Sequence, residues 1–444
     1  MKESKNKNRA LWLALGILLA LAAAVGLYFG VRAIVKRSDE PAQTQPPITT
    51  AAPEGTGTET SPEGTGTTAA TGSNTTETPE MTAAKTKAVY TDESITVDDP
   101  RLDQTVATCD DYSMTNRDAQ IFYTMQYYNF MNENGYMMAM LGMLDASKPL
   151  YEQTSTVGDL TWEQYFLMAS CEDFQQFASL TAKASAEGYT MSQADQEQME
   201  SAMQNLQTSY ATYGYDSIDA FVQGNFGPSV RYEDYERYLK FYYYAMSYEN
   251  SLYQGITATE QEMNDYYDAH PEEFAGVGKD QPNVNVRHVL ITPDVAEGAS
   301  EEKAAAAREV AKTKAGELLA TFEESPSEEA FAQLAAANSE DPGSKDNGGL
   351  YEDVYPGQMV QTFNDWCFDP ARQPGDTGIV ETSYGFHIMY FVSKTDTYYW
   401  KSKAEQSIRT EKLYELLDSM LKEHPGTIDY ENIVLSPLPK VEAS

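Results

Sequence analysis

The sequence has few basic residues, few histidines and few cysteines. Lysine and arginine total 31 against 68 aspartate and glutamate residues, which gives a formal net charge of −37. This imbalance argues against nucleic-acid binding through a basic face. Three cysteines without a CxxC pair allow at most one disulfide, and we predict that none is essential. Only four histidines are present, so the surroundings of each one are informative.

Two of these histidines lie inside apolar segments that read as strands. The segments are Val284–Ile291 and Thr382–Val392, in which β-branched and aromatic residues dominate and which Pro and Gly bound. By the period-two rule, His288 and His387 each share a strand face with apolar residues. A lone histidine in a strand is more often a satisfied core residue. Two such histidines, at opposite ends of one segment, are less easily explained as core residues.

The chain between these strands reads as two helices, a loop and a short helix. Ser300 can cap a helix over residues 300–322, and Ser325–Glu328 reads as a capping box that opens the second helix. Turn formers dominate residues 338–350, and a short helix is expected over residues 356–363. The order strand, helix, helix, strand, short helix, strand, strand predicts an α+β domain of about 110 residues.

Five motifs in this region resemble the parvulin-type peptidyl-prolyl isomerases. They are Arg287–Ile291, Ser339–Asp341, Gly348–Leu350, Gly357–Met359 with Phe363, and Tyr384–Ile388. Each motif is weak alone, but five in the family order with family-like spacing form a specific signal. One departure is the segment 351–356, which reads as a loop one residue longer than in compact relatives.

The resemblance implies a set of site residues. His288 and His387 would be the paired buried histidines under the active site, and Asp341 would fill the position held by Cys or Asp in the family. The implied substrate-binding residues are Leu350, Met359, Phe363 and Tyr384, the first three forming an apolar pocket for the proline ring. Taken singly, these residues have ordinary readings as a turn or as core.

The residue types suit rotation about an X–Pro bond. Amide resonance sets a barrier of about 18–20 kcal/mol, and no bond is broken, so neither a nucleophile nor a cofactor is needed. The site must hold the ring in a dry pocket and favour the twisted amide. Asp341 is expected to act electrostatically or through hydrogen bonds, not as a general base. Two His and an Asp could ligate a metal in a hydrolase, but the spacing lacks a zinc signature and we expect no metal.

The N-terminus predicts a membrane anchor and a tether. Basic residues precede an apolar run from Ala10 to about Val35, long enough to cross a bilayer, so residues 1–37 are expected to form a cytoplasmic tip and an uncleaved signal anchor. A cleaved signal peptide is the alternative. Residues 38–88 are rich in Thr, Gly, Pro and Glu and are expected to be a disordered linker.

Residues 89–282 have the periodicity of an all-α domain that follows a short strand at residues 104–109. The expected helices cover residues 116–144, 161–187, 192–213, 216–224, 231–254 and 259–269. Most of the chain's 18 Met and many of its 31 Tyr lie in this region. Most of them can simply fill a helical core, but such a surplus also suits a surface that re-packs against many partners.

The C-terminal part predicts a return to the helical domain. Residues 400–423 form an amphipathic pattern that needs a partner, and the final residues 433–435 are expected as a short strand or as loose chain. The helix before the isomerase segment resembles that of PrsA- and SurA-type extracytoplasmic foldases. By this resemblance, residues 396–436 pack on the helical domain, residues 283–395 are a parvulin-like domain inserted in it, and residues 437–444 are a tail.

The sequence therefore predicts a single-pass membrane protein whose bulk is extracytoplasmic. It would isomerise X–Pro bonds in unfolded or partly folded secreted polypeptides and also act as a chaperone for them. The alternative is a non-catalytic holdase or peptide-binding protein in which the parvulin domain is an inactive scaffold. Association into a homodimer stays open.

Overall fold

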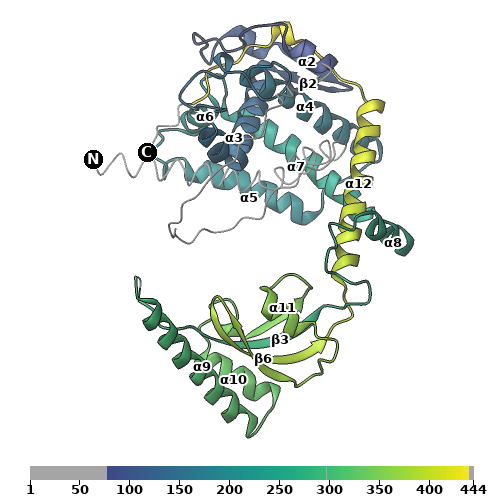
Figure 1. The fold of residues 1–444 in the computed structure, drawn as a ribbon. Coiled ribbons are helices and arrows are strands. Elements are labelled where there is room, and N and C mark those ends of the chain that lie inside the picture. The colour runs from purple at the N-terminus through teal and green to yellow at the C-terminus, as the bar shows by residue number, and fades with distance from the viewer. Residues whose placement is uncertain (1–77, 297, 440–444) are drawn as a thin grey trace, which may run out of the picture. The chain divides into compact units, whose positions relative to one another are not determined.

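The computed structural model describes residues 78–296 and 298–439, which form two compact units (Figure 1). The first unit contains the described residues up to Leu252 together with those from Leu416 onward, and the second spans Tyr253–Glu415. The expected signal anchor and most of the expected linker lie outside the described residues. Within residues 78–296 and 298–439, no helix combines the length and hydropathy needed to span a bilayer.

The first unit is mainly helical. Its helices are α2 (Pro79–Ala84), α3 (Asn116–Met140), α4 (Trp162–Ala186), α5 (Gln193–Ser209), α6 (Ile218–Phe226) and most of α7 (Tyr232–Gly255). Capping boxes at Thr115 and Thr161 start α3 and α4, since each hydroxyl accepts from the third helical N–H while that residue's side chain accepts from the cap N–H. Aromatic contacts fill the core, for example Phe122 against Phe174 and Tyr238.

A small sheet makes the first unit less purely helical than the sequence predicts. Strands β1 (Thr105–Cys109), β2 (Tyr112–Thr115) and β7 (Thr427–Ile428) form it in the order β2-β1-β7. The strand β7 lies at residues 427–428, while at the expected 433–435 only Leu435 pairs as in a strand, through a single parallel β-bridge to Thr91, and the side chains of 433–435 are buried. The end of the predicted linker is also ordered, because Thr78 caps α2 and Met81 is buried.

The second unit contains a four-stranded antiparallel sheet of order β4-β3-β6-β5. Its strands are β3 (Val284–Ile291), β4 (Leu350–Val354), β5 (Thr377–Thr382) and β6 (Gly385–Lys394). The order β3, α9, α10, β4, α11, β5, β6 confirms the predicted α+β order. Segment 351–356, expected as a loop, begins as strand β4. The unit also contains α8 (Glu260–Ala269) and the first part of α12 (Tyr399–Glu423), which pack through Phe274, Val277 and Trp400.

Helices cover the two faces of this sheet differently (Figure 1). Helices α9 (Glu301–Glu323) and α10 (Glu328–Asn338) pack on the face that carries Val289, Ile291, Phe386 and Ile388. The short helix α11 (Gln361–Cys367) packs on the opposite face. Because strand side chains alternate, the two predicted histidines belong to the α11 face.

Local boundaries differ from the predictions where a cap was misjudged. Ser327, not Ser325, caps α10, since its hydroxyl accepts from Ala330 N–H. Ser300 stands at the start of α9 without a side-chain cap bond. Helix α11 begins at Gln361, so Met359 precedes the helix that contains Phe363. The predicted domain limits at 89–282, 283–395 and 396–436 remain predictions, because the division into two units is coarser than these limits.

Candidate active site

The register of the two central strands brings the two histidines into contact. In the β3–β6 ladder, His288 lies opposite Met389 and Leu290 lies opposite His387, so the histidines are diagonal neighbours on one face. Their Nδ1 atoms are 3.0 Å apart, and the rings stack with centroids 5.2 Å apart. His288 is 2% exposed and His387 6% exposed.

Phe363 meets both imidazoles edge to face. Its ring centroid lies 5.5 Å from that of His288 and 5.4 Å from that of His387, with interplanar angles of 82° and 88°. The Phe363 ring is itself 3% exposed and belongs to the apolar cluster on the α11 face, with the half-buried Met359 packed against that cluster. An apolar wall therefore lies directly against the paired histidines.

The loop before β4 places an acidic side chain on the far nitrogen of His288. Asp341 Oδ2 and Ser344 Oγ each lie 3.0 Å from His288 Nε2, and the Ser344 hydroxyl donates to the same carboxylate oxygen. Tyr351 also donates to it, at 3.0 Å. Gly349 anchors this loop at φ +72°, where a Cβ would come within 2.2 Å of the His288 carbonyl oxygen, so only glycine fits.

These contacts fix the direction of every hydrogen bond in the network. Asp341 accepts from Ser344, so the Ser344 oxygen and the carboxylate both face His288 Nε2 as acceptors, and Nε2 must carry a proton. A neutral His288 then accepts at Nδ1 from His387 Nδ1–H. The Nε2 of His387 is left to accept from the Thr382 hydroxyl, 2.8 Å away, and that oxygen accepts from Tyr384 N–H at 3.1 Å.

The electrostatics favour two neutral imidazoles beside one charged carboxylate. Burial lowers the pKa of His288 and outweighs the opposing effect of Asp341. Burial and the neighbouring His288 lower the pKa of His387 to about 4. Burial tends to raise the pKa of Asp341, but hydrogen bonds from Ser344, His288 and Tyr351 together lower it.

The structure brings some of the predicted residues together and leaves others apart. His288, Asp341, His387 and Phe363 form one contact network, with Met359 at the edge of the apolar cluster. Leu350 lies opposite Arg287 in the β3–β4 ladder and so belongs to the other face, where Arg287 binds Glu328. Tyr384 is 63% exposed and joins the network only through its backbone N–H.

Three residues of the network were missed from the sequence. Tyr351, Ser344 and Thr382 all bond directly to Asp341 or to a histidine. Tyr351 had a usable signal, because it pairs with Val286 and therefore shares the face of His288, one position on from Leu350. Reading segment 351–356 as a loop concealed that alternation. Ser344 and Thr382 gave no comparable signal, since hydroxyl residues are ordinary in turns.

The residues present give no sign of a metal centre. In the described part of the chain, no three His, Cys, Asp or Glu side chains come together as a metal site. His288 spends both ring nitrogens on protein partners, and so does His387. The three cysteines are buried and free.

The site falls within a region that matches a known family. Residues 273–395 match the model of the PPIC-type PPIASE domain. Foldase protein PrsA 1 of Listeria innocua is 32% identical over 126 residues, which cover 28% of this chain and 35% of that protein. Chaperone SurA of Pseudomonas syringae is 32% identical over 130 residues, which cover 28% of this chain and 27% of that protein. The chain thus spans about a third of the length of these curated relatives.

A solved structure is also similar. The peptidylprolyl isomerase PrsA from Bacillus anthracis is 20% identical, and the match covers 57% of this chain and 95% of that chain. The TM-score of this match is 0.22. The sequence matches confirm the predicted resemblance: the chain carries a parvulin-type domain and is similar to the PrsA and SurA foldases.

Neutral buried histidines make the second unit sensitive to acid. An unfolded histidine titrates near 6.5, whereas His387 in the folded unit titrates at about 4, so the unfolded state binds more protons between these values. The contribution of His387 to the free energy of unfolding is therefore fully present above pH 6.5. It is lost as the pH falls toward 4, by about 3 kcal/mol in total. Urea unfolding at several pH values, read by hydrogen exchange in β3 and β6, measures this loss.

The variant His387→Gln is the comparison for this pH dependence. It should lose most of the change between pH 6.5 and 4.5 while keeping the steeper loss below pH 4, where Asp341 and other carboxylates become protonated. Identical pH profiles for the wild type and the variant across the upper window would show that His387 is not held neutral by the fold.

Proposed function

We propose that this chain is a parvulin-type peptidyl-prolyl cis–trans isomerase that also acts as a chaperone for unfolded polypeptides. The observation that carries the isomerase half is the contact of the two neutral, buried imidazoles with each other and with Phe363. The match of residues 273–395 to the PPIC-type PPIASE domain supports the same reaction. The relatives named foldase and chaperone support the chaperone half.

An uncharged apolar site lowers the barrier to rotation about the X–Pro bond by destabilising the planar amide. The planar amide owes its stability to resonance that separates charge, and the twisted amide has lost that resonance. Desolvation therefore penalises the planar ground state more than the twisted form. The proline ring is proposed to rest against Phe363 and the half-buried Met359. Because the histidines are neutral, no positive charge lies next to the amide. The negative charge of Asp341 is stabilised by hydrogen bonds from His288, Ser344 and Tyr351.

The network has a positioning role in this proposal. His288 and His387 are tied at both nitrogens and cannot turn without breaking a bond to the carboxylate or to Thr382. They fix the ring of Phe363, which in turn shapes the surface that the proline meets. Tyr351 takes the role predicted for Leu350, since it faces the site and donates to Asp341.

The chaperone half rests on an exposed apolar segment of the first unit. Five large hydrophobic side chains lie within eight residues at the end of α3: Tyr136, Met137, Met140, Leu141 and Met143. Their exposed fractions run from 44% to 85%. We call this set the 136–143 patch. By contrast, the tyrosines of α7, such as Tyr235 and Tyr238, are buried and belong to the core.

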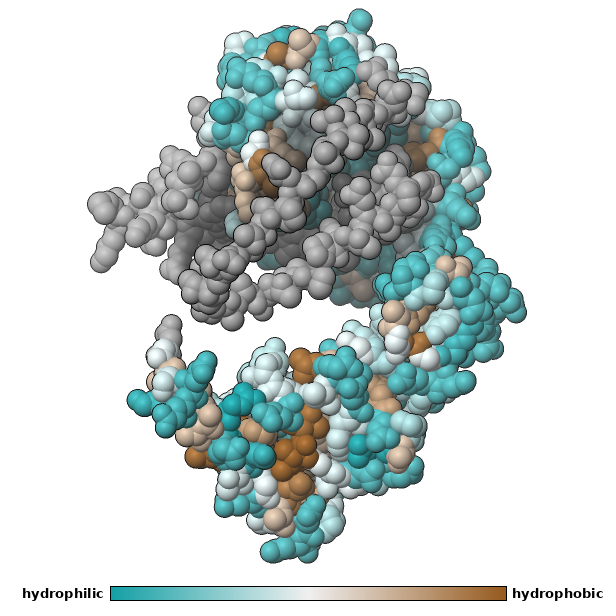
Figure 2. All heavy atoms as spheres, in the orientation of Figure 1, coloured by the Kyte–Doolittle hydropathy of each residue, from teal (hydrophilic) through white to brown (hydrophobic). Residues whose placement is uncertain are grey.

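The chemistry of the 136–143 patch fits a variable apolar partner. Methionine is flexible and polarisable, so one surface can adapt to many side chains. Contiguous exposed apolar groups are uncommon on monomeric proteins and mark interaction sites. Elsewhere the visible surface is largely hydrophilic, with brown apolar residues gathered in a few places (Figure 2). Unfolded polypeptide segments are the proposed partner, and a second copy of the chain is the rival.

An extracytoplasmic, membrane-anchored location completes the proposal. It is supported by the apolar run at residues 10–35, the polar linker that follows it, and the sparse cysteines. Protease added to intact cells should digest the bulk of the chain while a fragment that begins at the N-terminus stays with the membrane fraction. Digestion only after the membrane is opened would contradict this topology.

The isomerase proposal predicts a large effect from Phe363→Ala. Removing the ring deletes the apolar wall and loosens both imidazoles, a loss of about 2–3 kcal/mol that lowers kcat/KM by about 30- to 150-fold. A proline-limited peptide assay with the purified protein measures it. Ile379→Ala, on the exposed outer strand β5, is the matched control and should keep full activity.

Two outcomes of this assay oppose the proposal. A wild-type protein that gives no rate increase would favour the non-catalytic peptide-binding alternative. Activity that disappears with a chelator would favour a metal enzyme. We expect activity that a chelator leaves unchanged.

The chaperone proposal predicts a separable effect from polar substitutions in the 136–143 patch. Met137→Gln combined with Met140→Gln and Leu141→Gln should weaken suppression of aggregation of an unfolded model protein by about tenfold in the concentration needed. Isomerase activity on short peptides should stay unchanged. Val310→Gln, an equally exposed apolar position on α9, is the control. If the triple variant instead lost dimers in sedimentation and kept suppression, the patch would be a self-association surface.

A further inference from the structure

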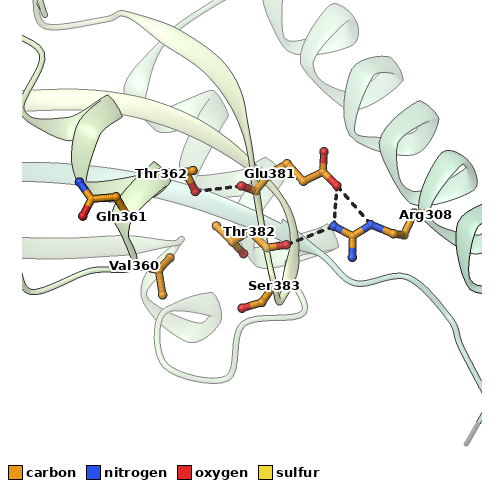
Figure 3. Close-up of a pocket in the computed structure, with 7 residues that line it drawn as sticks. All are labelled: Arg308, Val360, Gln361, Thr362, Glu381, Thr382 and Ser383. Atoms are coloured by element: carbon orange, nitrogen blue, oxygen red, sulfur yellow. Dashed lines mark hydrogen bonds and ion pairs between the residues drawn. The ribbon is translucent and has the colours of Figure 1, made fainter. Parts of the chain in front are cut away.

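A pocket of about 420 Å³, whose lining residues Figure 3 shows, shares Thr382 with the histidine network. Its lining residues are Arg308, Val360, Gln361, Thr362, Glu381, Thr382 and Ser383. Thr382 belongs to both features, because its hydroxyl donates to His387 Nε2 and the residue also lines the pocket. The α11 side of the pocket is formed by residues 360–362, which lie between Met359 and Phe363. The pocket therefore adjoins the chain segment that is proposed to meet the proline ring.

Glu381 and the Thr382 carbonyl hold the guanidinium of Arg308 in the pocket. Arg308, on α9, donates through Nε and Nη2 to Glu381 Oε1, at 3.2 and 2.5 Å, and through Nη2 to the Thr382 carbonyl at 3.4 Å. Its guanidinium also lies 6.0 Å from the centroid of the Phe386 ring. Among the described residues, Arg308 Nη1 has no partner, and Figure 3 shows one guanidinium nitrogen without a dashed line.

The charges around this free nitrogen select a neutral acceptor. Glu381 neutralises most of the charge of Arg308 but leaves the Nη1 hydrogens available. A carboxylate entering the pocket would meet Glu381 and the field of a chain with a formal net charge of −37. A main-chain carbonyl oxygen carries no net charge and accepts equally well. Ser383 also lines the pocket and offers a hydroxyl group there.

We propose that Arg308 binds a main-chain carbonyl of the substrate next to its proline, with Glu381 as the residue that positions the guanidinium. The inference rests on the proposed isomerase function and names how that site holds its peptide. Because every residue of a polypeptide offers a carbonyl, this anchor works whatever side chain precedes the proline. This hydrogen bond would let the site bind unfolded chains of unrelated sequence.

The test compares Arg308→Gln and Glu381→Gln with wild type on four tetrapeptides, Ala-Xaa-Pro-Ala with Xaa as Ala, Leu, Glu or Lys. Both kcat/KM and the peptide Kd, the latter from NMR titration of the purified protein, are measured. Losing one charged hydrogen bond should weaken Kd by about five- to tenfold for all four peptides, with kcat nearly unchanged. Arg308→Lys should recover part of the affinity. Lys312→Gln removes a positive charge one turn further along α9 and is the matched control.

Each result bears on the proposal separately from the isomerase function. A loss confined to the Glu peptide would replace the main-chain anchor with a side-chain carboxylate site. Unchanged Kd in Arg308→Gln, with folding checked by circular dichroism, would overturn the anchor. A wild-type protein that binds the peptides without accelerating isomerisation would refute the enzyme, while the Kd series would still decide the anchor. Should Arg308→Gln fail to fold, Arg308→Lys and Glu381→Gln carry the same comparison.

Discussion

The contact between His288 Nδ1 and His387 Nδ1, 3.0 Å apart in an apolar surrounding, is the constraint on which the site depends. Two like atoms can meet at that distance only if one carries a proton and the other does not. With both rings neutral, the direction is set by the carboxylate of Asp341, which can only accept, and the hydroxyl of Thr382 at the other end donates in response. Charging either ring would oblige the Thr382 hydroxyl to turn from donor to acceptor.

This constraint links the fold to the proposed chemistry. The antiparallel register of β3 and β6 makes the histidines diagonal neighbours, and the loop around Gly349 places the carboxylate beside one of them. All ring nitrogens of the network are hydrogen-bonded while both histidines are neutral, so the apolar side of the site stays uncharged. Desolvation there lowers the barrier to twisting the amide. Thr382 connects this network to the neighbouring pocket, because its carbonyl accepts a hydrogen bond from Arg308.

The sequence predicted the parts of the fold that follow from periodicity. Strand β3, the longer helices of both units within a few residues, and the order of the sheet domain were all accessible, because apolar spacing records burial, whereas the short helix α11 starts five residues later than predicted. His288 and His387 stood out for the same reason, as polar residues in apolar strands. Leu350 was chosen over Tyr351 because the choice needs the β3–β4 register, which depends on tertiary pairing. Strand β1 was predicted, but its partner β7 was missed because β7 is two residues long and pairs with β1 from more than 300 residues away.

The most direct test of this account is the protonation of the two imidazoles in solution. Four histidines in the chain make ring assignment by single variants practical. At pH 7, nitrogen-15 chemical shifts should report both rings neutral, with His288 protonated at Nε2 and His387 protonated at Nδ1, and a direct coupling across the Nδ1–Nδ1 hydrogen bond. An imidazolium signal at either position, or the opposite pair of tautomers, would contradict the account.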